Sequence, residues 1–377
     1  MTRRPAQLRV RRILVVCTRQ IGDVLLTTPL IRAARNLWPQ ARIDVLGFAG
    51  TLGMLRGNPD VTELIEAPPR LGSNALAFAR RLWRRYDLAL VTDAGDRAHI
   101  IAWIAARQRR GILPSEHRSN WWKRALLDGV VVAAGDRGDR HVTAEKLALL
   151  APWLDDSSVP QVVPPAAAPI PSEIAAALRP GCVIVHAPSM WAYKQWPLTH
   201  FERVIAELLA QGRQVVLTGS SSERDQQCIA PLRVLGAAPD LVDVSGRLGF
   251  NQLVTLMQGA ALYIGPDTSV SHLAAATGVP VIAIFGTTNP ARWGPWPAKL
   301  EPGAGYVQAK SLQSVGKVIL LQSELSCVPC GRAGCDDHRQ SRSDCLIDIS
   351  PQRVLAQAQR VLQEGDDLKG CARLAPR

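Results

Sequence analysis

Short apolar runs rich in β-branched residues recur along this chain, and segments with helical periodicity lie between them. The runs are continuous rather than alternating, which is typical of strands buried on both faces of a parallel sheet. The expected strands are Ile13–Cys17, Ile43–Leu46, Leu88–Val91, Val130–Ala133, Val183–His186, Val215–Thr218, Leu262–Ile264 and Val281–Phe285. Expected helices include Pro29–Trp38, Leu198–Gln211 and Asn251–Gly259. This alternation predicts a doubly wound α/β fold.

The length and one proline-rich stretch indicate two domains. A chain of 377 residues is long enough for two domains of ordinary size. Five prolines fall within Val159–Pro171, and proline continues neither a helix nor a central strand. We therefore expect a linker there, domains at 1–165 and 176–350, and a C-terminal helix and tail at 351–377. Two such domains in tandem place a cleft between the carboxyl ends of two sheets, where ligands bind in open α/β folds.

The net charge of +12 comes entirely from the first part of the chain. Residues 1–150 contain 25 Lys and Arg against 13 Asp and Glu, whereas residues 151–377 contain 19 of each class. A one-sided basic field favours an anionic partner such as a phosphorylated lipid, a membrane surface or a nucleic acid. The alternative is an arginine-rich surface that is only solvated.

The hydrophobic segments predict a cytoplasmic location. No apolar run reaches the roughly 18 residues that a membrane-spanning helix needs. The apolar run near the N-terminus ends at Thr18 and Arg19, so it is too short for a signal-peptide core and lacks a small-residue cleavage site. We interpret it as the first strand.

The first candidate site follows that strand. Asp23 lies in a short loop at the carboxyl end of the strand, beside the expected cleft. A carboxylate there can act as general base on an acceptor hydroxyl, and the alternative is an aspartate that caps a helix N-terminus. Thr28 and Pro29 have the pattern of an N-cap followed by proline at the first helical position.

Two polar loops follow strands in the second half of the chain. Lys194, in a loop that also contains Ser189, can neutralise phosphate oxygens as a compact charge, or it is an ordinary surface lysine. Farther on, Gly219 leads into Ser220–Ser222 and Glu223. Their hydroxyls and carboxylate can hold a ribose or a phosphate, and the alternative is a serine-rich helix cap.

The most informative segment lies between two expected strands. Asp267, Thr268 and Ser269 precede a short helix that carries His272. A helix N-terminus with unpaired N–H groups and neighbouring hydroxyls is suited to bind a diphosphate. His272 is either a ligand contact or a structural histidine with satisfied hydrogen bonds.

Four cysteines lie close together near the C-terminus. Cys327, Cys330, Cys335 and Cys345 follow the spacing C-x2-C-x4-C-x9-C. They predict a possible structural zinc site, although the spacing is not a standard zinc motif. The alternative is reduced thiols or partial disulfides, and in a cytosolic protein stable disulfides are rare. In each case we expect a structural role remote from catalysis.

Several motifs are absent from the sequence. It contains no P-loop and no G-x-G-x-x-G, which argues against ATPases and typical dehydrogenases. It also contains no D-x-D motif, so a diphosphate clamped by a metal ion is not indicated.

Five segments, in the right order, resemble the ADP-heptose:lipopolysaccharide heptosyltransferases of glycosyltransferase family 9. They are IGDVLLTTPLIRAARNLWPQARID, KQWPLTHFERVI, VVLTG, PDTSVSHLAAATGVPVIAIFGTTNPARWGP and the cysteine segment ending in CLIDISPQRV. The resemblance extends over nearly the whole chain. It implies an α/β protein of the GT-B fold, with two Rossmann-like domains facing across a cleft. The acceptor would bind to the N-terminal domain and the nucleotide-sugar to the C-terminal one.

The resemblance also implies roles for particular residues. Asp23 would be the catalytic base, and Lys194 would act on the donor diphosphate. The family pattern D-[TS]-G-x-x-H falls on residues 267–272, where Ser269 replaces the usual glycine. The implied donor-binding residues are Ser189, Lys194, Thr218, Gly219, Glu223, Asp267, Thr268, Ser269 and His272, with Glu223 against the nucleoside.

The implied reaction is a single inverting displacement that needs no catalytic metal. The implied donor is ADP-heptose or a related nucleotide-sugar. The implied acceptor is anionic lipid A with its core oligosaccharide, at the cytoplasmic face of the inner membrane, and no nucleic acid takes part. Two alternatives are a nucleotide-sugar epimerase of GT-B architecture and a non-catalytic carbohydrate- or lipid-binding protein on the same scaffold.

Overall fold

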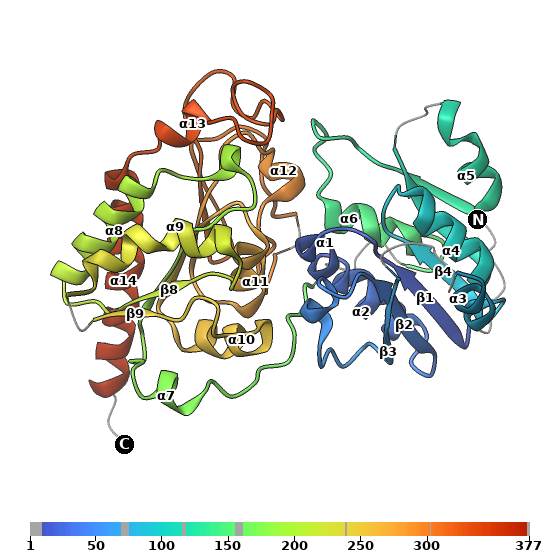
Figure 1. The fold of residues 1–377 in the computed structure, drawn as a ribbon, viewed down its shortest axis with the longest axis horizontal. Coiled ribbons are helices and arrows are strands. Elements are labelled where there is room, and N and C mark those ends of the chain that lie inside the picture. The colour runs from blue at the N-terminus through green and yellow to red at the C-terminus, as the bar shows by residue number, and fades with distance from the viewer. Residues whose placement is uncertain are drawn as a thin grey trace. The chain divides into compact units, whose positions relative to one another are not determined.

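The computed structural model describes residues 10–68, 75–114, 118–154, 161–237, 240–301 and 303–374. The chain divides into two compact units, which we call unit 1 (Met1–Ala166) and unit 2 (Ala167–Arg377). Unit 1 is blue to green and unit 2 green to red in Figure 1. The division falls within the proline-rich stretch, whose described part, residues 161–171, has no regular secondary structure.

The described part of unit 1 contains a six-stranded parallel sheet with the strand order β3-β2-β1-β4-β5-β6. The strands are β1 (Arg12–Val16), β2 (Arg42–Gly47), β3 (Glu63–Glu66), β4 (Tyr86–Val91), β5 (Ala106–Leu113) and β6 (Gly129–Val132). The helices are α1 (Ile21–Leu25), α2 (Thr28–Leu37), α3 (Ala75–Leu82), α4 (Asp96–Ala105), α5 (Trp121–Leu126) and α6 (Val142–Leu147), with 3-10 turns η1 (Leu52–Leu55), η2 (Arg118–Asn120) and η3 (Ala148–Leu150).

The centre of this sheet is buried because its strands are apolar along their length. Residues 13–16 of β1 have no exposed surface, as expected for strands covered on both faces. On one face, Leu14 and Val16 pack with Ala89 and Val91 of β4 against residues of α3 and α4. These two helices therefore cover the same face of the sheet.

The described part of unit 2 contains a seven-stranded sheet with the order β12-β13-β11-β10-β7-β8-β9, in which only β12 is antiparallel to its neighbour. The strands are β7 (Val183–His186), β8 (Val215–Thr218), β9 (Leu241–Asp243), β10 (Leu262–Pro266), β11 (Val281–Ile284), β12 (Leu312–Val315) and β13 (Val318–Leu321). The helices are α7 (Ser172–Ala175), α8 (Leu198–Ala210), α9 (Glu223–Arg233), α10 (Phe250–Gly259), α11 (Ser269–Thr277), α12 (Pro290–Trp293), α13 (Asp344–Ile347) and α14 (Pro351–Leu374), with 3-10 turns η4 (Ala192–Lys194) and η5 (Val234–Ala237).

The C-terminal helix α14 is part of the core of unit 2. Val354 of α14 and Phe201 of α8 lie in one buried cluster with Val215 of β8. Trp196 is fully buried in the same cluster, and its indole N–H donates to the Ile349 carbonyl at 2.9 Å. Within the described ranges of both units, no helix has the length and apolar character needed to cross a bilayer.

The two sheets share one topology. The order β9-β8-β7-β10-β11-β13 in unit 2 repeats the order β3-β2-β1-β4-β5-β6 of unit 1, and this is the order of doubly wound Rossmann sheets. The strand order reverses between β1 and β4 in one sheet and between β7 and β10 in the other. Ligands of open α/β sheets bind outside the carboxyl ends of the strands at this point.

Each of the eight strands expected from the sequence overlaps a strand of the structure, and the three named helices are also present. The expectation did not include β3, β5, β9, β12 and β13. Half of the residues of β5, ARQRRGIL, are polar, and the middle of the strand is only partly buried. Apolar patterning therefore gave no signal there, and parallel pairing with β4 and β6 holds the strand.

One expected helix cap is displaced by a residue. The N-cap of α2 is Thr27 rather than Thr28, and Pro29 is the second residue of the helix. The Thr28 hydroxyl instead donates to the Leu25 carbonyl and accepts from the Val163 N–H, both at 2.8 Å. The displacement arises because only two residues separate the end of α1 from the start of α2, so Thr28 is used to join the two helices.

Candidate active site

The residues singled out in the sequence lie where each sheet reverses its strand order. In unit 1, Asp23 comes after β1, and in unit 2, Lys194 comes after β7 while Asp267 directly follows β10. The strands of each central pair are parallel, so their carboxyl ends meet at one edge. Each unit therefore contributes its own set of polar groups at the position where Rossmann sheets bind ligands.

Asp23 is presented by a short helix rather than by a loop. The N-cap of α1 is Gln20, and Asp23 lies in the first turn, so the carboxylate is not the N-cap but lies where it interacts favourably with the helix dipole. The Asp23 side chain is 12% exposed, whereas Val24 and Leu25 are buried. The helix thus anchors its apolar residues in the core and leaves the carboxylate partly accessible.

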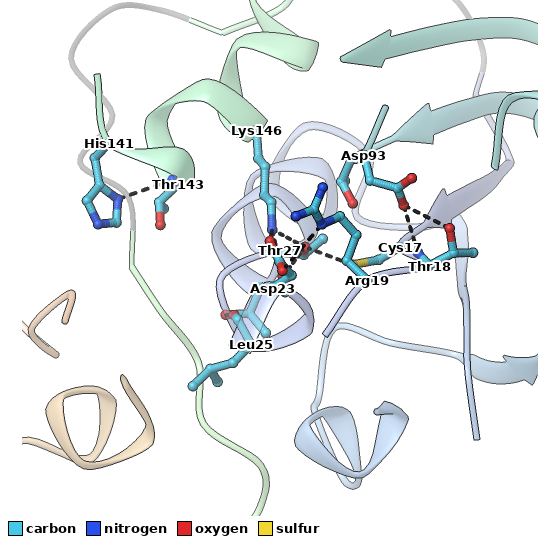
Figure 2. A network of polar contacts seen from close by, with 12 residues as sticks. Cys17, Thr18, Arg19, Asp23, Leu25, Thr27, Asp93, His141, Thr143 and Lys146 are labelled. Carbon is cyan, nitrogen blue, oxygen red and sulfur yellow. Dashed lines mark hydrogen bonds and ion pairs between the residues drawn. The ribbon is translucent and has the colours of Figure 1, made fainter. Parts of the chain in front are cut away.

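A buried lysine from α6 holds the backbone around Asp23 (Figure 2). Lys146 Nζ donates to the Asp23 carbonyl at 2.6 Å and to Thr27 Oγ1 at 3.0 Å. The Thr27 hydroxyl donates to the same carbonyl at 2.7 Å. Lys146 lies 123 residues away in sequence, and no local pattern in the sequence marked it as a site residue.

Two cations flank the Asp23 carboxylate. Lys146 Nζ lies 3.8 Å from Oδ1, and the half-exposed Arg19 places its Nε 3.6 Å from Oδ2 (Figure 2). Both distances are longer than a hydrogen bond. A carboxylate oriented by ion pairs of this length keeps lone pairs with which it can accept a proton. The geometry therefore suits a general base.

Asp93 connects the loop after β1 to the loop after β4 and was missed by sequence reasoning. Its Oδ2 accepts from the Thr18 N–H at 2.8 Å and from the Thr18 hydroxyl at 3.1 Å, and its Oδ1 accepts from the Gly95 N–H at 2.9 Å. Asp93 is buried, so its role is to fix the turn that leads into α1. Its place just after the expected strand Leu88–Val91 was the signal that could have found it.

In unit 2, Lys194 and Asp267 form a short ion pair. Lys194 Nζ lies 2.6 Å from Asp267 Oδ2, and the Thr288 hydroxyl donates to the same oxygen at 2.6 Å. Burial acts to raise the pKa of Asp267, but the charge and hydrogen bond of Lys194, the hydrogen bond of Thr288 and the charge of His272 together hold the pKa below its ordinary value. Lys194 is three-quarters buried, so it is not the ordinary surface lysine of the alternative interpretation.

The N-terminus of α11 lies beside this ion pair in the sequence. Thr268 is its N-cap, in extended conformation and without a side-chain cap hydrogen bond, and Ser269 is the first helical residue. Behind them, the Ser271 hydroxyl donates to the Pro266 carbonyl at 2.5 Å, and His272 is buried. The first N–H groups of a helix are available to an anion, so this segment retains the geometry that the sequence predicted for a diphosphate site.

The loop that carries Lys194 is closed by Gln195. Its side-chain oxygen accepts from the Ser189 N–H at 3.0 Å, and its amide donates to the carbonyls of Ala187 at 2.8 Å and Trp196 at 3.0 Å. The Ser189 hydroxyl is buried and has no hydrogen-bond partner among the described residues. Buried polar atoms are normally hydrogen-bonded, so this hydroxyl is suited to meet a ligand or water.

His186, at the end of β7, is a buried residue that sequence reasoning missed. Its Nδ1 lies 3.0 Å from Thr218 Oγ1, and burial lowers the pKa of His186 to about 4. Next to Thr218, a Cβ on Gly219 would lie 2.4 Å from Ile229 Cδ1. Thr218 and Gly219 are thus built into the packing at the end of β8, and their contact with a donor stays a prediction.

The serines after β8 form a helix cap. Ser222 is the N-cap of α9 and accepts from the Asp225 N–H at 3.3 Å, while the Ser220 hydroxyl donates to Ser222 Oγ at 2.9 Å. The cap interpretation is therefore confirmed for Ser222. Glu223 is exposed in the first turn of α9 and accepts from the Gln227 amide at 2.9 Å, and its contact with a nucleoside stays a prediction.

The four predicted zinc ligands do not form a recognisable metal site. Within the part of the chain that the structure describes, no three His, Cys, Asp or Glu side chains are placed to hold a metal ion. Cys327, Cys330, Cys335 and Cys345 are free thiols. Burial and, to a lesser degree, the other three thiols raise the pKa of Cys345 to about 12. The structure gives the zinc prediction no support.

The cysteine segment contacts the turn that carries the candidate residue Lys194, and its distance from catalysis stays a prediction. The Ser343 hydroxyl donates to the Tyr193 carbonyl at 2.7 Å, and the Ala192 N–H donates to the Arg339 carbonyl at 3.1 Å. The Arg339 guanidinium lies 4.4 Å from the ring centre of Trp191. The segment follows β13, whose carboxyl end lies at the same edge of the sheet as that of β7, and it supports the turn that carries Lys194.

Comparison with known proteins identifies the family of this chain. The profile of glycosyltransferase family 9 (heptosyltransferase) matches residues 75–303. Lipopolysaccharide heptosyltransferase 3 of Escherichia coli is 30% identical over 288 residues, which cover 73% of this chain and 83% of that protein. The chain belongs to glycosyltransferase family 9. It is therefore a glycosyltransferase, and the alternatives of an epimerase and a non-catalytic binding protein are not supported.

Solved structures of heptosyltransferases have the same fold. E. coli ADP-heptose lps heptosyltransferase II aligns with a TM-score of 0.69 at 21% identity, over 94% of this chain and 99% of that one. E. coli heptosyltransferase WaaC with ADP aligns with a TM-score of 0.67 at 16% identity, over 93% of this chain and 99% of that one. The two doubly wound units of this family 9 enzyme are thus the two Rossmann-like domains of a GT-B fold.

We predict that Lys146 positions Asp23. Lys146→Met removes two hydrogen bonds and one charge next to the carboxylate, so kcat for glycosyl transfer should fall at least about 10-fold. This loss is smaller than the roughly 100-fold or greater loss expected when the general base itself is removed. The nucleotide dissociation constant should not change, because the predicted nucleotide contacts lie in unit 2. Steady-state kinetics and calorimetric titration measure the two quantities.

Arg19→Gln is the matched control for Lys146→Met. Arg19 is exposed and its ion pair with Asp23 is long, and such pairs contribute little, so kcat should change less than about twofold. Wild-type kcat in Lys146→Met, or equal losses in both variants, would contradict the positioning role.

We predict that His186 makes unit 2 sensitive to acid. The folded-state pKa near 4 lies below the ordinary value of about 6.5, so the unfolded state binds more protons between these values. The free energy of unfolding should therefore fall as the pH decreases from about 6.5 to 4, by roughly 3 kcal/mol at most. His186→Gln should flatten this dependence in urea titrations, whereas the exposed control His338→Gln should keep the wild-type slope. An unchanged slope in His186→Gln would show that His186 is not the group responsible.

Proposed function

We propose that this glycosyltransferase moves heptose from ADP-heptose to the inner core of lipopolysaccharide, with inversion at the anomeric carbon. Its relatives support the substrate class, since one is named for heptosyl transfer to lipopolysaccharide and another was solved with ADP. The observation that carries the proposal is the Asp23 carboxylate after β1. Lys146 holds its backbone, and both of its oxygens lie beyond hydrogen-bond distance of their cations.

In the proposed reaction Asp23 acts as the base. It takes the proton of an acceptor hydroxyl while that oxygen attacks the anomeric carbon from the face opposite the nucleotide. The bond to the diphosphate breaks as the glycosidic bond forms, and the configuration inverts. Lys146 and Thr27 take no part in the proton transfer. They fix the Asp23 carbonyl and thereby the backbone position from which the carboxylate projects.

The departing diphosphate gains negative charge, and we propose that unit 2 stabilises it. Lys194 supplies positive charge and is held by Asp267, while Thr268 and the first N–H groups of α11 supply hydrogen-bond donors. Ser269, at the place of a glycine in the family pattern, adds a further hydroxyl. Groups of this kind perform the role that a metal ion has in other transferases, and we propose that the reaction needs none.

Three further contacts complete the proposed donor site. Glu223 is exposed at the start of α9 and would bind the nucleoside. The buried Ser189 hydroxyl and His272 would contact the donor from the loop after β7 and from α11. ADP-heptose is the proposed donor because E. coli WaaC was also solved with ADP-2-deoxy-2-fluoro heptose.

We propose that the acceptor is anionic lipid A with its core sugars and that the enzyme works at the cytoplasmic face of the inner membrane. The support is the charge distribution, since the whole net charge of +12 arises in residues 1–150. Phosphates and acidic sugars would be attracted to this part of the chain. No role for nucleic acid is proposed.

The proposed reaction predicts the behaviour of Asp23→Asn. An amide cannot take up the hydroxyl proton, so kcat should fall about 100-fold or more, while ADP affinity should remain unchanged. The assay is transfer from ADP-heptose to a lipid A–core acceptor, followed by mass spectrometry and repeated with EDTA. A variant that keeps over half of wild-type kcat would refute the base, and loss of wild-type activity in EDTA would refute metal independence. Donor turnover without acceptor would point to an epimerase instead.

We expect Lys194 to contact the diphosphate of the donor and not the nucleoside. Lys194→Ala should weaken ADP binding by about 1.5–3 kcal/mol, the value of a hydrogen bond to a charged group. AMP should lose less, because it lacks the second phosphate. Calorimetric titration measures both ligands, and Lys299→Ala, a lysine elsewhere in unit 2, is the control. Equal losses for ADP and AMP would place Lys194 away from the phosphates.

A further inference from the structure

The outer face of α3 and α4 exposes an unusual number of large apolar side chains. Leu76 of α3 is 61% exposed, and Ile100 and Trp103 of α4 are 41% and 42% exposed. Trp83, directly after α3, is 59% exposed. Together with Trp121 of α5, they are five of the six exposed large hydrophobic residues in the described part of unit 1. We call the surface formed by Leu76, Trp83, Ile100 and Trp103 the α3–α4 face.

An apolar pocket opens in this face. It has a volume of about 390 Å³ and lies between the two helices, with Leu76, Phe78, Ala79, Ile100 and Ile104 among its lining residues. The inner sides of the same helices pack on the sheet, so each helix has one apolar side inside the core and a second one outside it. Large exposed apolar patches on soluble proteins mark interaction sites.

The two tryptophans of the face lie near the same end of it. The Arg84 N–H donates to the Ile104 carbonyl at 3.0 Å, which ties the turn carrying Trp83 to the end of α4 that carries Trp103. The elements α3, α4 and α5 are neighbours within unit 1 (Figure 1). Tryptophan is the side chain most suited to the boundary between water and lipid, because one end is apolar and the indole N–H is polar.

Exposed arginines border the apolar residues. Residues 75–110 contain eight arginines and three aspartates, and Arg80, Arg84 and Arg107 are exposed. The exposed aspartate of α4, Asp96, is paired with Lys123, whose Nζ lies 2.6 Å from Oδ1. The face therefore combines an apolar surface with a positive border, which is complementary to anionic lipid headgroups above acyl chains.

We infer that the α3–α4 face docks on the surface of an anionic phospholipid bilayer, with Trp83 and Trp103 at the headgroup boundary and the neighbouring arginines on lipid phosphates. The inference rests on the membrane location proposed above and names the surface that would bind the membrane. It is separate from the chemistry, because Asp23 and Lys146 lie on α1 and α6 and contribute nothing to this face.

Vesicle binding tests the inference without donor or acceptor, so a failure of the proposed transfer reaction does not affect it. The full-length protein should co-sediment with vesicles of phosphatidylglycerol and phosphatidylethanolamine and bind vesicles of phosphatidylcholine at least 10-fold more weakly. Trp83→Ala/Trp103→Ala should reduce the partition coefficient at least 10-fold. Arg80→Ala/Arg107→Ala should reduce it about 25-fold, since each basic residue near an anionic surface contributes about fivefold, or roughly 1 kcal/mol.

Matched controls come from unit 2. Val307 and Leu325 are exposed to a similar extent, at 54% and 41%, so Val307→Ala/Leu325→Ala should bind like wild type. Arg203 and Arg360 are exposed on α8 and α14, and Arg203→Ala/Arg360→Ala should bind within twofold of wild type. Thermal unfolding confirms that each variant is folded.

Four outcomes would overturn the inference. They are wild-type protein that does not bind anionic vesicles, equal binding to neutral ones, tryptophan or arginine variants that bind like wild type, and controls that lose as much as the face variants. A wild-type dimer that the tryptophan substitutions convert to monomer, with vesicle binding unchanged, would assign the face to a second copy of the chain instead.

Discussion

The parallel pairing of the central strands is the constraint on which the rest of the structure depends. β1 pairs with β4 and β7 pairs with β10, and in each case the strand order reverses between the two partners. Because the following connections diverge there, the carboxyl ends of these strands are left open to a ligand. Asp93 shows how tightly this point is held in unit 1, since its carboxylate binds both the Thr18 and the Gly95 backbone. The catalytic candidates are displayed from turns fixed in this way.

A lysine–aspartate pair lies at the carboxyl ends of the central strands in each unit, and the geometry of the two pairs differs. Lys194 and Asp267 are 2.6 Å apart, whereas Lys146 and the Asp23 carboxylate are 3.8 Å apart, with Lys146 bound to the Asp23 carbonyl instead. In the first pair the lysine is the group expected to act on a ligand, and the aspartate holds it. In the second pair the roles are exchanged. A buried charge needs compensating partners, and here the partner also fixes the position of the group that is proposed to act.

The surplus of positive charge and the exposed apolar surface occur in the same unit. All of the net charge comes from residues 1–150, and exposed arginines border the α3–α4 face, whose helices cover one face of the sheet. Asp23, by contrast, lies on the short helix after β1. The unit thus separates a surface suited to a lipid boundary from the carboxylate suited to proton transfer, so that binding to a membrane need not disturb the chemistry.

The sequence by itself determined eight apolar strands, the doubly wound class and the polar residues that follow β1, β7 and β10, because apolar periodicity and loop chemistry are local properties. It did not indicate β5, whose polar residues are ordered by strand pairing, or Lys146, His186 and Asp93. These three acquire their roles from partners distant in sequence: Lys146 and Asp23 are 123 residues apart, Asp93 and Thr18 are 75 apart, and His186 and Thr218 are 32 apart. Only the tertiary structure brings such groups within hydrogen-bond distance, since burial and side-chain pairing are decided by packing and not by the local pattern.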